Sequence, residues 1–457
     1  MKYLSAPKLF SCFRHLSVVF TLLCFLIPTA VTGQVTTLSG WSDLYNGTSS
    51  PGNLTYTVST GSDSHRLLVV GVATSRTTSG SRSVAVTYGG QTLIPVEGDM
   101  SSSIRQHTQL YYLDEIGLDA ATSNTLAVSI SGGTTRRNGV FAMVLDNVDQ
   151  ANPVTDSRNY NSGNSTTSTF SFSGGLTINQ GDLPVKILCS DRASGGARTI
   201  YDFGTNWTAD VELVNNPVRN AAGARIIPNS DISDASTTSM SGSSYISMTG
   251  MSISAKKYFR SVQSGNWNST STWQQSLDNV TWTTANSVPT WGHGSTIIQS
   301  GHTVTLTAHA TVSSLTIDGT LNTGTYTLSG ISALTASSTG VINVSGTSNF
   351  PYGFSSVTLN DGSTVNYNLN GNQNIFATTY SNLTLSVGGT KSLTEATTVN
   401  GTLTISRPLT TNSYQLTLGG DFIQNSTFTQ GIGTVLINGN TTQTISGNTA
   451  TTFYNLT

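Results

Sequence analysis

The sequence predicts an all-β protein, in which a β-sandwich of the jelly-roll kind is followed by a capped β-solenoid of the β-helix kind. Three observations predict this class. Only 9% of the residues are charged, far below the usual quarter of a globular protein, and Thr, Ser, Gly, Asn and Val dominate. Short runs of β-branched and aromatic residues recur between Gly, Asn, Asp and Ser, without an amphipathic helix. Such runs also repeat in the second half of the chain, as stacked coils do.

Residues 1–33 are typical of a secretory signal peptide. Basic residues from Lys2 to Arg14 precede an apolar run over 16–27, and small residues precede Gln34. We therefore predict cleavage before Gln34 and an exported protein, extracellular or on the cell surface. No later apolar run is long enough to cross a bilayer, so we expect no transmembrane segment in the mature chain.

Residues 34–257 are expected to form the β-sandwich. Seven or more strand-like runs cross this segment, among them RLLVVGVAT, SVAVTYGG, TQLYYLDE and GVFAMVLDNV. Tyr111 and Tyr112 are neighbours on one strand, so they face opposite sides of a sheet, and we expect one in the core and one exposed. Cys189, the single cysteine after cleavage, is expected to be a buried, inert thiol.

Residues 258–300 are rich in tryptophan and are expected to cap the solenoid, because its first coil would otherwise leave a strand edge and a core end open. The expected cap residues are Trp267, Trp273, Trp282, Trp291 and His302.

Residues 301–457 are expected to be the solenoid itself. STVNYNLNGNQNIFATTYSNLT matches GTVLINGNTTQTISGNTATTFYNLT with small gaps, and a unit of this kind needs stacked neighbours to bury its apolar face. The second copy stops inside the repeat at Thr457, so we expect the sequence to be a fragment of a longer protein.

Three histidines, His293, His302 and His309, lie close together in the sequence, but their spacing does not favour a metal site. Structural zinc usually has closer paired ligands or cysteine partners, and the stretch has no HxH or HExxH pattern. We predict no metal and no cofactor, and we expect His302 to hydrogen-bond backbone groups where the first coil begins.

The sequence does not favour catalysis. It has no nucleophile elbow, phosphate-binding loop or dinucleotide fingerprint, and His107 and Asp114 are an odd number of residues apart, so they face opposite sides of a strand. A polysaccharide lyase or hydrolase on the solenoid would need charged residues that converge in one groove. This enzymatic function is kept as an alternative, and Lys391, Glu395 and Arg407 are the residues that would have to converge.

Aromatic residues are the stronger candidates for binding, because exposed rings stack on the apolar faces of sugars. The candidates in the sandwich are Trp41, Tyr45, Tyr88, Tyr112 and Trp207, and packing in a core is the competing interpretation of each. A net charge of −2 lacks the basic footprint of a nucleic-acid-binding protein. The expected partner is therefore an extracellular polysaccharide or cell-surface glycan, and a carbohydrate-binding module is a further alternative.

The cap segment resembles a module of large secreted surface proteins of Bacteroidetes that carry a type IX secretion sorting domain. The residues that carry the resemblance are RSVQSGNW over 260–267, then Trp273 and Trp282, then Pro289-Thr290, then GHTVT over 301–305. RLLVVGV, VTYGGQTL, LYYLD and VDQANPV are likewise similar to exported bacterial domains. The resemblance implies a non-enzymatic, structural or adhesin-like surface protein with His302 in a structural motif. The sorting domain of that class is absent from this sequence, so surface attachment is implied by the resemblance alone.

Overall fold

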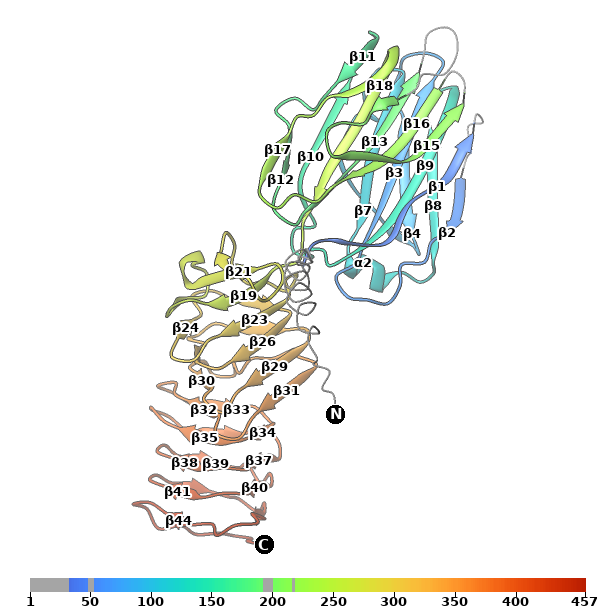
Figure 1. Cartoon of the computed structure of the whole chain (residues 1–457). Coiled ribbons are helices and arrows are strands. Elements are labelled where there is room, and N and C mark those ends of the chain that lie inside the picture. Colours follow the sequence, from blue (N-terminus) through green and yellow to red (C-terminus); the bar gives the residue numbers. More distant parts are fainter. Residues whose placement is uncertain (1–32, 48–52, 192–199, 216–217) are drawn as a thin grey trace, which may run out of the picture. The chain divides into compact units, whose positions relative to one another are not determined.

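The computed structural model describes residues 33–47, 53–191, 200–215 and 218–457, and the predicted signal peptide lies outside the described residues apart from Gly33. The regular elements are nearly all strands, in antiparallel sheets up to Ile253 and in mainly parallel, solenoid-forming sheets after it (Figure 1). The predicted fold class is confirmed. No helix among the described residues is long and apolar enough to cross a membrane.

Three antiparallel sheets form the N-terminal part. The first has the order β1-β9-β3-β7-β6, with β1 (Thr36–Gly47), β3 (Leu67–Arg76), β6 (Ile94–Gly98), β7 (Gln106–Leu113) and β9 (Thr135–Asp146). The second has the order β2-β8-β4-β5, with β2 (Asn53–Thr57), β4 (Ser83–Tyr88), β5 (Gln91–Thr92) and β8 (Thr125–Ser131). The third has the order β10-β18-β13-β16-β15, with β10 (Val154–Asn161), β13 (Leu183–Asp191), β15 (Trp207–Asn215), β16 (Val218–Arg225) and β18 (Thr238–Ile253).

Smaller elements complete this part. They are the helix α2 (Glu115–Ala120), the strands β11 (Thr167–Phe170) and β14 (Ile200–Asp202), which pair with β18, and the two-stranded sheet of β12 (Leu176–Ile178) and β17 (Ile232–Asp234).

The first sheet lies between the second and the third, so its central strands are buried on both faces. Along β3, Leu67 and Val69 pack in a core shared with β13 and β18, whereas Leu68 and Val70 pack in a core shared with β4 and β8. A strand covered on both faces is a continuous apolar run without alternation, which explains RLLVVGVA. Gly71 lies in the middle of β3, where an added Cβ would come within 2.8 Å of Ile187 on β13.

The third layer corrects the expectation for the two tyrosines of β7. Tyr111 belongs to the core on the β4 side, and Tyr112 packs against the core on the β13 side, so they do face opposite ways. Neither is exposed, because both faces of β7 are covered, and burial raises the pKa of both phenols. Cys189 on β13 is fully buried, and burial raises the pKa of its thiol as expected for an inert packing residue.

The solenoid strands pair in parallel from coil to coil. A nine-stranded sheet has the order β20-β24-β27-β30-β32-β35-β38-β41-β44, with β20 (Gly265–Asn266), β24 (Thr303–Thr305), β27 (Thr320–Asn322), β30 (Val341–Val344), β32 (Thr364–Tyr367), β35 (Asn382–Leu385), β38 (Leu403–Ile405), β41 (Phe422–Gln424) and β44 (Ile445–Ser446). A seven-stranded sheet has the order β22-β21-β19-β23-β26-β29-β31, with β19 (Tyr258–Ser261), β21 (Trp273–Ser276), β22 (Thr283–Thr284), β23 (Ser295–Ile298), β26 (Ser314–Ile317), β29 (Ala333–Ala336) and β31 (Ser356–Leu359). Its strands β22, β21 and β19 pair antiparallel, and the strands from β19 to β31 pair in parallel.

Three smaller parallel sheets close the coils. They are β25 (Ala310–Val312) with β28 (Leu328–Gly330); β33 (Gln373–Ile375), β36 (Lys391–Leu393), β39 (Leu409–Thr410) and β42 (Phe428–Thr429); and β34 (Thr379–Tyr380), β37 (Thr397–Val399), β40 (Leu416–Leu418) and β43 (Val435–Ile437).

Consecutive coils advance by 17 to 23 residues, the extremes being the step from Val304 to Leu321 and the step from Ile342 to Val365. Side chains alternate between the inside and the outside of each strand. The inside holds one continuous apolar core, and the outside holds mainly Thr, Ser and Asn.

Asparagine side chains on the outside of the nine-stranded sheet bond to one another across coils. Asn343 Nδ2 donates to Asn322 Oδ1 at 2.7 Å, and Asn366 Nδ2 donates to Asn343 Oδ1 at 3.2 Å. These bonds follow the register of β27, β30 and β32, so they reinforce the backbone ladder.

Two of the four cap tryptophans close the end of the solenoid core. Trp267 and Trp273 are each 1% exposed, they belong to the same core as the coils, and their rings meet edge to face at 5.1 Å. Trp282 and Trp291 are half-buried, and the Arg260 guanidinium lies 4.5 Å from the centre of the Trp282 ring. The inner pair therefore fills the core, and the outer pair lies nearer to solvent.

Candidate functional site

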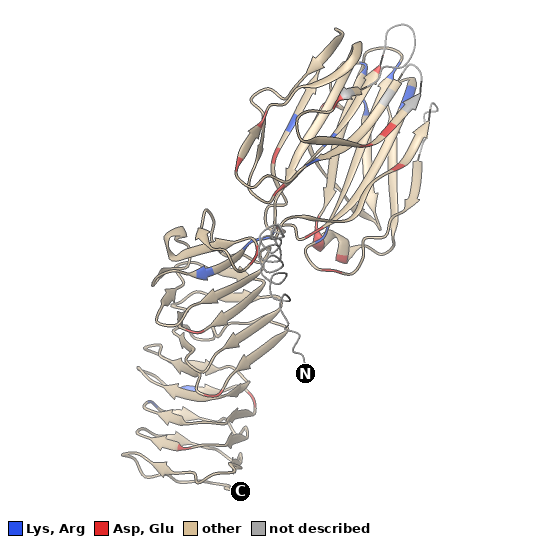
Figure 2. Ribbon diagram, viewed as in Figure 1, with Lys and Arg blue, Asp and Glu red and all other residues tan. Residues whose placement is uncertain are grey.

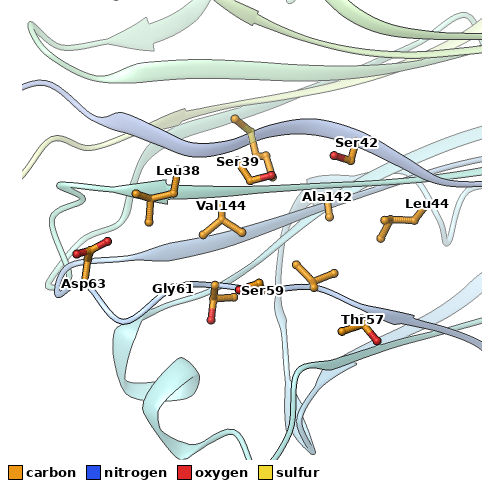
Figure 3. A pocket seen from close by; sticks show the side chains of 13 residues that line it. Leu38, Ser39, Ser42, Leu44, Thr57, Ser59, Gly61, Asp63, Ala142 and Val144 are labelled. Atoms are coloured by element: carbon orange, nitrogen blue, oxygen red, sulfur yellow. The ribbon is translucent and has the colours of Figure 1, made fainter.

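A groove of about 430 Å³ opens between β1, β9 and the segment that follows β2 (Figure 3). Its lining residues, which define the serine–threonine groove, are Leu38, Ser39, Ser42, Leu44, Thr57, Val58, Ser59, Thr60, Gly61, Asp63, Ala142, Met143 and Val144. The volume lies in the range of small-molecule sites. Hydroxyl groups and one carboxylate around an apolar floor fit a ligand that carries several hydroxyl groups.

One wall of the groove is β1, an irregular edge strand. Its register against β9 shifts at three places, between Thr37 and Ser39, between Ser39 and Ser42, and between Asp43 and Tyr45. Irregularities of this kind bend a strand and interrupt its hydrogen-bond ladder. β1 therefore departs from regular pairing with β9 where it lines the groove. The strand is mostly exposed, whereas the floor on β9 is buried.

The hydroxyl of buried Tyr88 stabilises the opposite wall of the groove, which residues 57–61 form. The hydroxyl donates to Val58 O at 2.9 Å and lies 3.4 Å from Thr60 Oγ1. Val58 N also donates to Asn124 O at 2.9 Å. These hydrogen bonds hold residues 58–60 in place on the side away from the groove.

Arg66 holds the same wall at its far end. Its Nη1 donates to Gly61 O at 2.6 Å, while its other nitrogens bond to Glu115 and, at 2.8 Å, to Asp119. The hydrogen bond to Glu115 raises the pKa of Arg66, so the guanidinium stays charged. Because both ends of the wall are held, a ligand would not have to order it on binding.

The structure buries three of the five aromatic residues that the sequence suggested for sugar stacking. Trp41 is 7% exposed, Tyr88 is 1% exposed and Trp207 is 7% exposed. Trp41 packs edge-on against Phe141, with 6.4 Å between ring centres. A buried ring offers no face to a ligand, so the competing interpretation, packing in a core, describes these three residues.

The other two candidates, Tyr45 and Tyr112, are half-buried. Tyr45 packs against the core between the first and second sheets, and Tyr112 packs against the core between the first and third. The five residues thus belong to different layers and do not form one binding face.

Trp207 has an internal partner, because the ammonium of Lys186 occupies the face of its ring. Lys186 Nζ lies 4.1 Å from the Trp207 ring and 4.6 Å from the Phe203 ring, and it donates to Thr238 Oγ1 at 3.1 Å. Burial lowers the pKa of Lys186 to about 7. Trp207 Nε1 donates to Asp234 Oδ2 at 2.7 Å, so this part of the chain is a closed internal cluster.

His302 is hydrogen-bonded to a side chain of a neighbouring strand. Its Nδ1 lies 2.9 Å from Ser261 Oγ, and the same hydroxyl accepts a hydrogen bond from Gln299 N at 2.9 Å. The ring therefore links β19 to the turn before β24. Its partner is a side chain, and not the backbone groups expected from the sequence.

The neighbouring histidines bond elsewhere. His293 Nδ1 accepts from Thr290 N at 3.0 Å, and its Nε2 lies 3.3 Å from Asp149 Oδ2, whereas His309 Nδ1 lies 2.7 Å from Thr327 Oγ1. Across the described part of the chain, no group of three or more His, Cys, Asp or Glu residues is placed to hold a metal ion.

The three charged solenoid residues that an enzyme would need do not meet in one groove. Lys391 is fully buried, and its ammonium donates at 2.6–3.2 Å to Leu369 O, Gly371 O and Gln373 Oε1. Glu395 lies in the turn after β36, and Arg407 lies in the turn after β38, both exposed. The ammonium of Lys391 is thus engaged inside the coil.

Replacing Lys391 should show that it acts as an internal hydrogen-bond donor. Lys391→Leu leaves buried carbonyls without a donor, which costs about 1–3 kcal/mol for each such group, so the urea midpoint should fall clearly. Lys391→Gln should lose less, because Gln373, its register partner, already donates to Val344 O and Gly346 O in the same manner. Equal losses in the two variants would contradict this role.

The sequence did not reveal the serine–threonine groove. Its walls come from separate segments, and the run Thr57–Gly61 resembles the many other Ser/Thr/Gly runs of this chain. No family model matches the chain, and no curated protein or solved structure does either.

Proposed function

We propose that this chain is an exported, non-enzymatic surface protein, structural or adhesin-like, with the solenoid as its stalk. The observation that carries the proposal is the small number of charged residues in the coils (Figure 2). The charged residues over 301–457 are Asp318, Asp361, Lys391, Glu395, Arg407 and Asp421, and Lys391 faces inward. A stack with a continuous core and an outside of Thr, Ser and Asn suits a rigid spacer better than a reaction site.

Two features of the sequence support export and surface display. The first 33 residues have the pattern of a secretory signal, and the cap segment resembles modules of type IX-secreted surface proteins. The burial of Trp267 in the solenoid core and the contact of His302 with Ser261 support a cap role for that segment.

A carbohydrate-binding function of the N-terminal sheets is a second candidate, favoured by the serine–threonine groove. Its hydroxyl groups and the Asp63 carboxylate can exchange hydrogen bonds with a sugar, while Leu38 and Val144 can contact the apolar C–H groups of the ring. A small neutral saccharide is the ligand that this lining fits best.

Depletion assays with polysaccharides test the proposal. The purified protein is mixed with a set of soluble and insoluble polysaccharides, and both the protein left in solution and new reducing sugar ends are measured. We expect depletion by at least one polysaccharide without new reducing ends. New reducing ends that increase with time would show an enzyme and contradict the proposal.

A bulky residue in the groove tests the second candidate. Ser42 is exposed, lines the groove and pairs with Ala142, so Ser42→Trp should fill the space and weaken binding of mono- and disaccharides at least about tenfold. Thr37→Trp is the matched control, because Thr37 is exposed on the same strand but does not line the groove. Unchanged saccharide binding by Ser42→Trp would exclude the groove as the site.

A further inference from the structure

Three of the four exposed aromatic residues of the solenoid follow a pattern that the sequence alone does not show; the fourth, Tyr352, lies outside it. Thr379, Thr398, Thr417 and Leu436 are successive partners in the sheet of β34, β37, β40 and β43. The residues three positions before them are Phe376, Glu395, Tyr414 and Gly433. The next coil continues the series with Tyr454, because Leu456 pairs with Val435.

Counted back from the following strands, aromatic residues thus recur at every second coil of this turn, although the turn lengthens from Ile375–Thr379 to Thr411–Thr417. We call Phe376, Tyr414 and Tyr454 the aromatic column; they are 39%, 41% and 68% exposed. Adjacent parallel strands lie about 4.8 Å apart, so successive members of the column are separated by about 9.6 Å along the stack. That separation is close to the length of two sugar rings joined end to end.

The residues between the aromatic ones are Gly433, which has no side chain, and Glu395, which is charged. The backbone of Gly433 lies against Ser413 and Tyr414, where a Cβ would come within 2.6–2.7 Å of their carbonyl oxygens. Glu395 is exposed and offers a carboxylate that can accept hydrogen bonds from hydroxyl groups. The column therefore alternates exposed aromatic side chains with a glycine and a carboxylate.

We infer that the aromatic column binds an uncharged β-1,4-linked polysaccharide that runs along the stack of coils. In such a chain each sugar is turned over relative to the next, so the same ring face recurs at every second sugar. Aromatic rings at every second coil match that period, and stacking needs no charge, which this surface largely lacks. An α-linked chain, which curves, does not match it.

The inference deepens the proposed adhesin-like function and rests on it, but it places a polymer site on the solenoid, apart from the serine–threonine groove. Phe376 is partly anchored, since its ring stacks on buried Phe350 at 4.9 Å with an interplanar angle of 11°. Tyr454 is the most exposed member and Tyr414 is about as exposed as Phe376, so the two tyrosines are the positions to change.

Calorimetric titration of the full-length protein with cellohexaose, cellobiose and maltohexaose tests the inference. We expect cellohexaose to bind more tightly than cellobiose, and maltohexaose to bind no better than cellobiose. Tyr414→Ala and Tyr454→Ala should each weaken cellohexaose binding about five- to tenfold, and the double variant should abolish it. Both positions are exposed, so the unfolding midpoint should not change.

Ile432→Ala is the matched control, because Ile432 is a 71% exposed apolar residue in the same turn but outside the column. It should bind cellohexaose as the wild type does. Cellohexaose binding that survives the double tyrosine variant but is lost in Ser42→Trp would assign the oligosaccharide to the groove, which overturns the column and leaves the proposed function intact. No binding of cellohexaose by the wild type would also overturn the column, and the depletion assay would then decide the proposed function separately.

Discussion

Trp267→Ala is expected to lower the free energy of unfolding of the solenoid by about 3–5 kcal/mol, the usual cost of removing a large buried aromatic side chain. Trp267 is 1% exposed, and together with Trp273 it closes the apolar core at the end of the first coil. Because each coil is stabilised mainly by its neighbours, an opened end should also expose the coil of β24 and β27. Differential scanning calorimetry should show a melting temperature lower by roughly 10 °C.

Trp282→Ala is the control for this prediction. Trp282 is half-buried, and Arg260 stacks on its ring, so the variant should lose about 1 kcal/mol or less. If the two variants melted at the same temperature, the cap would not depend on the inner tryptophan pair.

The second large effect concerns Asp99, a buried carboxyl group next to the core of the N-terminal sheets. Its Oδ1 accepts from Thr108 N at 2.8 Å, and its Oδ2 accepts from Ser247 Oγ at 2.7 Å. Burial outweighs these bonds and raises the pKa of Asp99 to about 7 from 3.8. The folded state therefore holds a proton that the unfolded state releases, so this stabilisation is complete below about pH 4 and is lost as the pH rises to about 7.

The expected loss is about 4 kcal/mol between pH 4 and pH 8, from a pKa difference of about three units. Asp99→Asn has the same shape and no charge, so the difference between its urea midpoints at pH 5 and pH 8 should be much smaller than for the wild type. Burial also raises the pKa of Asp191 to about 6 and lowers the pKa of His107. As the pH rises, the first shift lowers the stability and the second raises it, and both residues are present in both proteins. An equal pH dependence in the two proteins would rule out Asp99 as its source.

The sequence predicted the solenoid well because its rules are local. Inside positions such as Val365 and Tyr367 alternate with outside Thr364 and Asn366, and this pattern repeats coil after coil. Large apolar side chains were expected at the open end of this core, and Trp267 and Trp273 belong to that core.

The layering and the binding surfaces could not be predicted, because they depend on contacts between distant segments. Whether Trp207 is exposed depends on Lys186, which comes from another strand and fills the face of its ring. Tyr112 is covered only because the third sheet packs over β7. The aromatic column depends on register across coils of unequal length. Tyr414 follows Phe376 by 38 residues, whereas Tyr454 follows Tyr414 by 40 residues.

The parallel ladders also determine how the solenoid responds to mechanical force. The hydrogen bonds between coils run along the stack, so a pull on its two ends loads them one coil at a time, and the terminal coil should peel away first. A coil of 17 to 23 residues that unravels releases about 55–80 Å of extended chain, against a rise of about 4.8 Å in the folded stack. Under tension the solenoid would therefore lengthen in steps and absorb work at each step, which would limit the force that is transmitted along the chain.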